Sequence, residues 1–390
     1  MTSPVKGKPF LILSKQRLVF SPHSDLTVVR VHIQIKIVIY MEEKKMNKFI
    51  AVVMALVMLL ALCACGAAPA ATDAPDSAPT TANTEAHDFR FSLANSSESV
   101  HGQNILHWID NIDAARGEGK TGISITLYPN NQLGSVDEML EQVMMGENIM
   151  LSTDPGALKN WAPELAILEC PYFFENEQEP TLIFQTEWFQ NQLKTLEEHG
   201  IKVLSGEMIY GSRHIMATDP IRNSADMVGL KIRVPGNDVS VSMIEAMGGT
   251  ATPMSLSEVY AAIQQGVING MENPFATHID NNMWEVCDYL SLTGHQITTS
   301  WYVMSADVFN ALPASEQEFL MATAADARDY FNSINTAANE AALQTLRDKG
   351  VTVVDDVDIA EFKEATASVY DKFGYSELRA EIYAQMDQFR

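Results

Sequence analysis

The stretch SEQEFLMATAADARDYFNSINTAANEAALQTLRDK, residues 315–349, decides the fold. Ser315 and Glu318 predict a capping box at its start, Gly350 predicts its end, and neither proline nor glycine interrupts it. At about 1.5 Å per residue this helix measures roughly 50 Å, longer than one small domain is wide. We therefore expect a helix that braces two domains, and a cleft between them that closes by hinge bending.

Alternating strand and helix patterns precede this helix. Residues 89–93 alternate as in a half-buried strand, and apolar residues over 105–112 recur at helical spacing. A second strand over 123–127 follows, and then a helix opened by a capping box of Ser135 and Glu138. This order predicts an α/β layer with parallel strands.

The same order recurs downstream, where residues 230–234 alternate and Ser255 with Glu258 predicts the cap of a helix that ends near Gln265. We therefore predict two α/β domains, with the chain crossing between them near 205–211 and 294–300. The predicted boundaries are 87–210 with 299–338 for the first domain, and 211–298 with 339–390 for the second.

The amino terminus has the pattern of an export signal. Lys44, Lys45 and Lys48 precede an apolar run over 49–62, which at about 14 residues is too short to span a bilayer unaided. We interpret residues 46–64 as a signal peptide; an unprocessed membrane anchor is the alternative. Residues 1–45 add nothing that a secreted protein needs, so we interpret them as an over-extended start ahead of Met46 or Met41.

The apolar run ends in Leu62-Cys63-Ala64-Cys65-Gly66, which resembles the lipobox of bacterial lipoproteins. Cys65 is the predicted acylated residue, because bulky Leu62 fits poorly before a cleavage at Cys63. Residues 65–86 then form a lipidated tether that has no side chain able to anchor a core. The two remaining cysteines, Cys170 and Cys287, are too few for a disulfide framework, and we expect them to be small buried hydrophobes.

The charge of the chain excludes one class of partner. The sequence has 26 basic and 50 acidic residues, and 17 basic and 47 acidic residues remain beyond residue 48. A body with this much negative charge repels the phosphate backbone of nucleic acids. We therefore expect no nucleic acid partner. An anionic ligand would have to be held by a few local arginines.

No pattern in the sequence points to catalysis. The segment Ala114–Thr121 matches a permissive phosphate-loop pattern, but a helix precedes it and a strand follows, the reverse of the order that a phosphate loop needs. Lys120 is therefore interpreted as a turn residue. The sequence has no H-E-x-x-H, C-x-x-C or G-x-S-x-G motif. We expect no enzyme activity, no cofactor and no metal.

An ordered series of motifs suggests a binding protein instead. The series is Tyr210-Gly211-Ser212-Arg213, then the stretch 226–235 (DMVGLKIRVP), Thr252-Pro253-Met254, Ser257-Glu258-Val259-Tyr260 and Gly270-Met271-Glu272-Asn273-Pro274, with Asn131-Gln132-Leu133-Gly134, Pro163-Glu164-Leu165 and Pro171-Tyr172-Phe173-Phe174 upstream. From about residue 88 to the end, the chain resembles the extracytoplasmic solute receptors of TRAP transporters, the DctP-type proteins.

The resemblance implies a two-domain, periplasmic-binding-protein-like α/β fold of the Venus flytrap type, with a long helix bridging both domains. It also implies a small-molecule carboxylate ligand, such as a C4-dicarboxylate or a sugar acid, and delivery of that ligand to TRAP permease membrane subunits. Together with the lipobox, it predicts a monomer that is held by lipid on the outer, periplasmic side of the cell membrane.

The resemblance also assigns roles to three residues. Arg233 is the implied anchor of the ligand carboxylate, and Arg213 assists it. A planar guanidinium can donate two parallel charge-assisted hydrogen bonds to a carboxylate, which lysine cannot do. Taken alone, the alternation of 230–234 places Arg233 on a solvated face with Lys231. Asn273 is implied to complete the clamp, with a turn asparagine as the alternative.

Five further positions are candidates for the pocket lining. Asp154 occupies the place where relatives that bind polyhydroxylated acids carry a carboxylate for sugar hydroxyls, although it also fits a turn start. The weaker candidates are Asn95, His101, Met254 and Trp301, each of which also fits a cap, surface or core role. Ala94 departs from relatives that have a polar ligand contact there, so the identity of the substrate stays open.

Two other functional classes compete with a transport receptor. A ligand-sensing lipoprotein that signals to a membrane histidine kinase would use the same domain closure. A surface hydrolase or adhesin would need a catalytic constellation or repeats, and the sequence has neither.

Overall fold

The computed structural model describes residues 85–390, so the predicted signal peptide, most of the tether and Cys65 lie outside the described residues. Within this range nine strands form one continuous sheet in the order β2-β1-β3-β8-β4-β7-β5-β6, with β9 paired to β8. The strands are β1 (His87–Ser92), β2 (Ile123–Tyr128), β3 (Ile149–Thr153), β4 (Ile201–Ala217), β5 (Lys231–Val234), β6 (Thr250–Pro253), β7 (Gly270–Asn273), β8 (Tyr289–Ser305) and β9 (Thr352–Val354).

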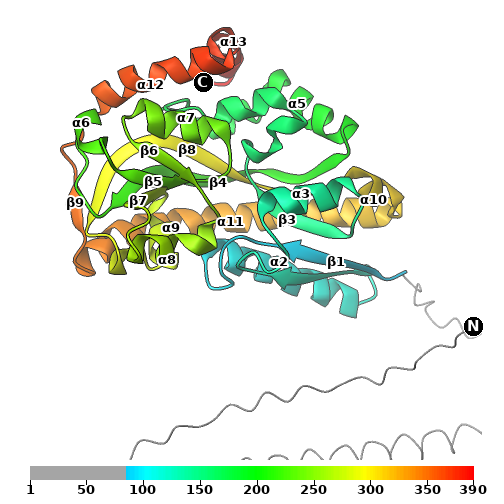
Figure 1. Ribbon diagram of the computed structural model, residues 1–390. Helices are drawn as coiled ribbons and strands as arrows, with labels where there is room; N and C mark the ends of the chain where they lie inside the picture. Colours follow the sequence, from blue (N-terminus) through cyan, green and yellow to red (C-terminus); the bar gives the residue numbers. More distant parts are fainter. Residues whose placement is uncertain (1–84) are drawn as a thin grey trace, which may run out of the picture. The chain divides into compact units, whose positions relative to one another are not determined.

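Helices cover both faces of this sheet (Figure 1). The α-helices are α2 (Val100–Gly117), α3 (Val136–Met144), α4 (Pro180–Ile183), α5 (Glu187–Glu198), α6 (Ser224–Met227), α7 (Asp238–Ala246), α8 (Val259–Gln264), α9 (Phe275–Asp280), α10 (Ala306–Ala311), α11 (Ala314–Asp348), α12 (Ile359–Phe373) and α13 (Ser376–Met386). In this part of the chain, no helix has both the length and the apolar character that crossing a membrane requires.

Parallel strands occur at both ends of the sheet, as the strand and helix order predicted. At one end β1 pairs in parallel with β2 and β3, and at the other β5 pairs in parallel with β6 and β7. Between them β4 and β8, each 17 residues long, run antiparallel through the middle of the sheet. The predicted capping box at the start of α3 is confirmed, since Ser135 and Glu138 cap each other's backbone. The predicted fold class is confirmed.

The long helix α11 spans 35 residues and packs on β4, α2 and α9 (Figure 1). Phe331 belongs to the apolar core beneath β1 and α2, whereas Leu346 belongs to the core formed with β7, α8 and β8. One helix therefore contributes to two cores, which is the bracing role that its length predicted.

The predicted capping box of α11 is wrong. Pro313 occupies the cap position, and no side chain caps the first turn. Proline is well suited to this start, because its fixed φ favours the first turn and its missing N–H is not needed there. Glu318 therefore has no capping role, while the neighbouring Glu316 is buried and accepts a hydrogen bond from the backbone N–H of Gly122 at 2.9 Å.

The second predicted box, of Ser255 and Glu258, is also wrong. Residues Leu256–Glu258 form a short 3-10 helix without a side-chain cap, and α8 starts only at Val259. The Ser255 hydroxyl instead accepts a hydrogen bond from the side-chain amide of Asn131 at 2.5 Å. A tertiary contact has replaced the local cap.

The carboxyl-terminal helices pack on distant parts of the sheet. Helix α12 packs on α7 and places Phe362 in the core beneath β5, whereas α13 packs on α4 and α5. Ile382 and Met386 of α13 join the core that contains α5.

The domain boundaries given above stay a prediction. Cys170 and Cys287 are buried and free, which confirms their expected place in the core.

Candidate functional site

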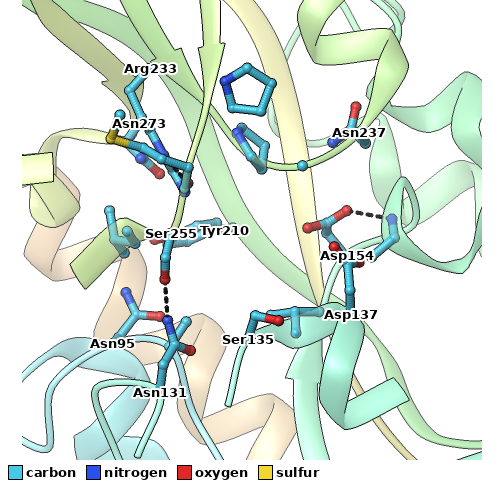
Figure 2. Close-up of a pocket in the computed structure, with 18 of the residues that line it drawn as sticks. Asn95, Asn131, Ser135, Asp137, Asp154, Tyr210, Arg233, Asn237, Ser255 and Asn273 are labelled. Carbon is cyan, nitrogen blue, oxygen red and sulfur yellow. Dashed lines mark hydrogen bonds between the residues drawn. The ribbon is translucent and has the colours of Figure 1, made fainter. Parts of the chain in front are cut away.

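The cavity that gathers most of the expected site residues, termed the main cavity, lies where the parallel strands end. Its volume is about 340 Å³, and Figure 2 shows its polar side chains pointing inward from both sides. Carboxyl ends of parallel strands converge at one edge of a sheet, which is the common place for ligands in α/β folds. The lining residues follow β1, β2, β3, β5 and β6 or lie in β4, β5, β6 and β7: Ala94, Asn95, Asn131, Ser135, Val136, Asp137, Asp154, Ala157, Tyr210, Arg213, Arg233, Pro235, Gly236, Asn237, Pro253, Met254, Ser255, Leu256 and Asn273.

A smaller chamber of about 100 Å³ shares part of this lining. It is bordered by polar groups from β3, β8 and the start of α2, and both cavities touch Asp154, Tyr210 and Arg213. The residues that line only the smaller chamber are His101, Ser152, Thr153, Glu169, Thr298, Thr299 and Ser300. The site therefore continues inward from the main cavity as a polar recess.

Arg233 is buried in the wall of the main cavity, with 6% of its surface exposed. Its Nε donates to the backbone carbonyl of Met254 at 2.9 Å, which fixes the plane of the guanidinium. Among residues 85–390 no carboxylate forms an ion pair with it, and burial lowers its pKa to about 10. It is still protonated at neutral pH, so the cavity presents a cation that lacks a partner. The solvated face that alternation alone indicated for this residue is wrong.

Arg213 enters from β4 and is already paired. Its Nη2 lies 2.7 Å from Oε1 of Glu272, its Nε donates to the other carboxylate oxygen, and both side chains are buried. Burial opposes both charges, but the guanidinium outweighs it and lowers the pKa of Glu272 to about 2. His295 Nε2 lies 3.3 Å from the same carboxylate. Arg213 thus reaches the cavity with its charge largely neutralised.

Asn273 and Asp154 both line the main cavity, as the resemblance implied. Asn273 is the last residue of β7, and its buried amide makes no hydrogen bond within the described residues. Oδ1 of Asp154 accepts the backbone N–H of Ala157 at 3.0 Å, so this residue also starts a turn. Burial raises the pKa of Asp154, while Arg213 counteracts that rise.

Asn95 and His101 are brought to the recess. The amide nitrogen of Asn95 is buried and has no hydrogen-bond partner in this part of the chain. The His101 ring packs edge-on to Tyr210 at 4.5 Å and lies 4.7 Å from Phe331, measured between ring centroids. Burial lowers its pKa to about 3, so the ring is neutral at physiological pH.

The last two candidates differ. Met254 lines the main cavity and binds Arg233 through its carbonyl. Trp301 lines neither cavity: its side chain is fully buried, packs on Phe189 at 5.6 Å between ring centroids and donates to the Thr299 hydroxyl at 2.8 Å. Trp301 is therefore a core residue, which was the alternative interpretation of this position, and not part of the cavity lining.

Sequence reasoning missed several lining residues. Tyr210 and Asn131 stand inside quoted motifs, so each was visible without being recognised as part of the site. Glu272, the partner of Arg213, also stands in a quoted motif. Glu169 directly precedes the Cys170 to Phe174 stretch and gave no signal, because an isolated glutamate is ordinarily exposed.

Glu169 is instead buried beside the recess. Its carboxyl group accepts hydrogen bonds from Thr298 Oγ1 at 3.0 Å and from the amide of Gln296. Burial, together with the neighbouring Asp154, raises its pKa to about 8. Two carboxyl groups, those of Asp154 and Glu169, therefore line the recess.

An α/β fold braced by one long helix, with a cavity at the strand ends that presents buried arginines, defines the class of solute-binding proteins. Residues 91–377 match the family described as bacterial extracellular solute-binding protein, family 7, or DctP. The chain belongs to this family, whose members are extracytoplasmic.

Known proteins agree with this assignment. The C4-dicarboxylate-binding periplasmic protein DctP of Rhodobacter capsulatus is 28% identical over 268 residues, covering 68% of this chain and 76% of the relative. A TRAP periplasmic solute-binding protein of Actinobacillus succinogenes, solved with bound L-galactonate, has a TM-score of 0.73 at 29% identity and covers 77% of this chain and 99% of its own. Another from Ochrobacterium anthropi, with bound L-fuconate, has a TM-score of 0.72 at 31% identity, with coverage of 77% and 99%.

Proposed function

We propose that this protein is a receptor that binds a small organic acid through its carboxylate, with Arg233 as the main anchor. The observation that carries the proposal is the buried guanidinium of Arg233, which faces the cavity and has no carboxylate partner among residues 85–390. A buried charge without a partner is costly, and a ligand carboxylate would supply the missing one. Arg213 and Asn273 support it, because both line the same cavity and Asn273 has an unused amide.

A sugar acid is the preferred ligand. The remainder of the lining is rich in hydroxyl, amide and carboxyl groups, which are suited to the hydroxyls of an aldonate or uronate. The relatives solved with L-galactonate and L-fuconate contain ligands of this kind.

We further propose that the receptor is held on the outer face of the membrane by lipid on Cys65 and delivers its ligand to a TRAP-type secondary transporter. Membership of the family supports the transporter as partner, and the lipobox pattern supports the anchor. The comparisons give no support to the sensor alternative.

A thermal-shift screen tests the proposal. Ligand that binds only the native state raises the melting temperature, so the purified protein is screened against aldonates, uronates, C4-dicarboxylates and neutral polyols. We expect at least one organic acid to raise the melting temperature, and its matched polyol to have no effect. A panel in which no acid binds, or in which polyols bind as well as acids, would contradict carboxylate recognition.

A further inference from the structure

The charges around the cavity are distributed unequally. Among residues 85–390, Arg213 and Arg233 are the only arginine or lysine side chains that line either cavity. They enter from β4 and β5, which lie on either side of β7. Glu272 already neutralises Arg213 through two hydrogen bonds. The cavity therefore offers about one uncompensated positive charge, located at Arg233.

The opposite wall carries carboxyl groups. Asp154 follows β3, Asp137 lies in the first turn of α3, and Glu169 borders the recess behind them. Figure 2 shows Asp154 and Asp137 across the cavity from Arg233. A second negative charge on a ligand would meet these carboxyl groups, with no lysine or arginine to offset it.

The recess can receive hydroxyl groups. The amide of Asn95 and the hydroxyl of Thr153 are buried there without a hydrogen-bond partner among the described residues. The Ser152 and Ser300 hydroxyls lie 3.1 Å apart in the recess. Neutral donors and acceptors of this kind bind hydroxyls without requiring charge on the ligand.

From this arrangement we propose that the site selects acids with one carboxylate and hydroxyls at the far end, and rejects dianions such as aldarates, C4-dicarboxylates and phosphate monoesters. The inference rests on the proposed function and narrows it from organic acids to monocarboxylates. It separates this chain from the relative named for C4-dicarboxylate binding. Repulsion from the wall of Asp154 and Asp137 supplies the rejection, because specificity arises as readily from disfavouring the wrong ligand as from favouring the right one.

Paired ligands provide the test. Calorimetry compares each aldonate with the aldarate of the same carbon skeleton, for example galactonate with galactarate and gluconate with glucarate, with succinate and malate alongside. We expect the best-binding aldonate to exceed its aldarate by at least about tenfold in affinity, given the cost of like charges near a protein surface.

Substitutions of Asp154 and Asp137 test whether these carboxylates cause the rejection of dianions. Asp154→Asn should reduce the ratio of aldonate to aldarate affinity by at least about fivefold, since it removes the repelling charge. Asp137→Asn, at the exposed rim, should shift the ratio in the same direction and serves if Asp154→Asn does not fold. Asp110→Asn, exposed on α2 and away from both cavities, is the matched control and should leave the ratio unchanged.

The outcomes separate the two proposals. An aldarate or C4-dicarboxylate that binds as tightly as the best aldonate would overturn the charge selection while leaving carboxylate recognition intact. A ratio that neither Asp154→Asn nor Asp137→Asn changes would also overturn it. Failure of every acid to bind would overturn the proposed function, and the selection with it.

Discussion

Arg213 and Arg233 carry the same side chain, yet their neighbours give them different roles. Arg213 is paired with Glu272 inside the protein, so its main contribution is a fixed position in the wall. Arg233 donates only its Nε–H to the carbonyl of Met254, so its two terminal nitrogens can donate to a ligand. The strand motif around each arginine does not reveal this difference, because it is made by Glu272 of β7, which lies 59 residues from Arg213 in the chain.

The buried Glu169 should make the stability of the protein depend on pH. Burial holds its pKa near 8 in the native protein, while the ordinary value of an unfolded glutamate is 4.5. Between these values the native state binds more protons than the unfolded state, so this residue makes the protein less stable as pH rises. Glu169→Gln is neutral throughout and removes that penalty.

We therefore expect Glu169→Gln to gain stability relative to wild type as pH rises. The difference in the free energy of unfolding, variant minus wild type, should be larger at pH 8 than at pH 5. Urea denaturation at the two pH values measures this difference. Glu141→Gln, exposed on α3, is the control and should follow the wild-type profile. Parallel profiles of wild type and Glu169→Gln would show that the group is already ionised at pH 5.

At the scale of elements, α11 is bound to β4 by a row of asparagines. The register of β4 against β8 shifts repeatedly between Val203 and Ile215, which leaves backbone groups without a partner in the sheet. Asn332 accepts the N–H of Ile209 at 2.8 Å, and Asn335 donates to the carbonyls of Ile209 and Tyr210 at 2.9 Å each. The helix thus satisfies an irregular strand that runs alongside the cavity.

Asn335→Ala should destabilise the protein by about 1–3 kcal/mol, because it removes the side-chain donor of the Ile209 carbonyl and leaves the Tyr210 carbonyl only the 3.5 Å contact with Asn339. Chemical denaturation measures the loss, and Ser333→Ala, exposed on the same helix, should stay within about 0.5 kcal/mol of wild type. An equal effect of both substitutions would indicate that helix propensity, rather than the bond to β4, is being measured.

For the whole molecule, the sequence predicted the general plan of the fold better than the details of the site. The length and continuity of residues 315–349 predicted the bracing helix, and the alternating patterns predicted parallel strands, because both signals are local. The caps at Ser315 and Ser255 were mispredicted, since Pro313 in one case and a contact with Asn131 in the other overrode the local pattern.

The site residues likewise fall into those that the sequence predicted and those that it did not. The arginines and Asn273 were reached through the family resemblance, whereas Glu169 and Asn237 come to the cavity only through folding and carry no local motif. The burial of Arg233 likewise depends on the strands on either side of β5, which alternation along one strand does not describe.

Closure on ligand is a prediction at this scale. Asn131, which follows β2, and Ser255, which follows β6, meet at the cavity through a hydrogen bond (Figure 2). Lys159, which follows β3, pairs with Asp238 of α7. We therefore expect this arrangement to be the closed one. Gly211, with φ of +115°, lies at a register shift of β4 that a hinge could use.

We expect small-angle scattering to give a smaller radius of gyration with saturating ligand than without it. An unchanged radius, when calorimetry confirms saturation, would indicate a pocket that does not move.

Arg233 is the proposed anchor of the ligand carboxylate, and calorimetry on Arg233→Ala and Arg233→Lys is the decisive experiment. Truncating one partner of a buried charge-assisted pair typically costs about 2–5 kcal/mol, which is roughly thirtyfold to several thousandfold in affinity. Lysine should also bind poorly, because a point charge does not reproduce the fork of the guanidinium. We expect both variants to fold and to bind the identified acid at least about thirtyfold more weakly than wild type. Folded variants that both bind it within about threefold of wild type would place the anchor elsewhere.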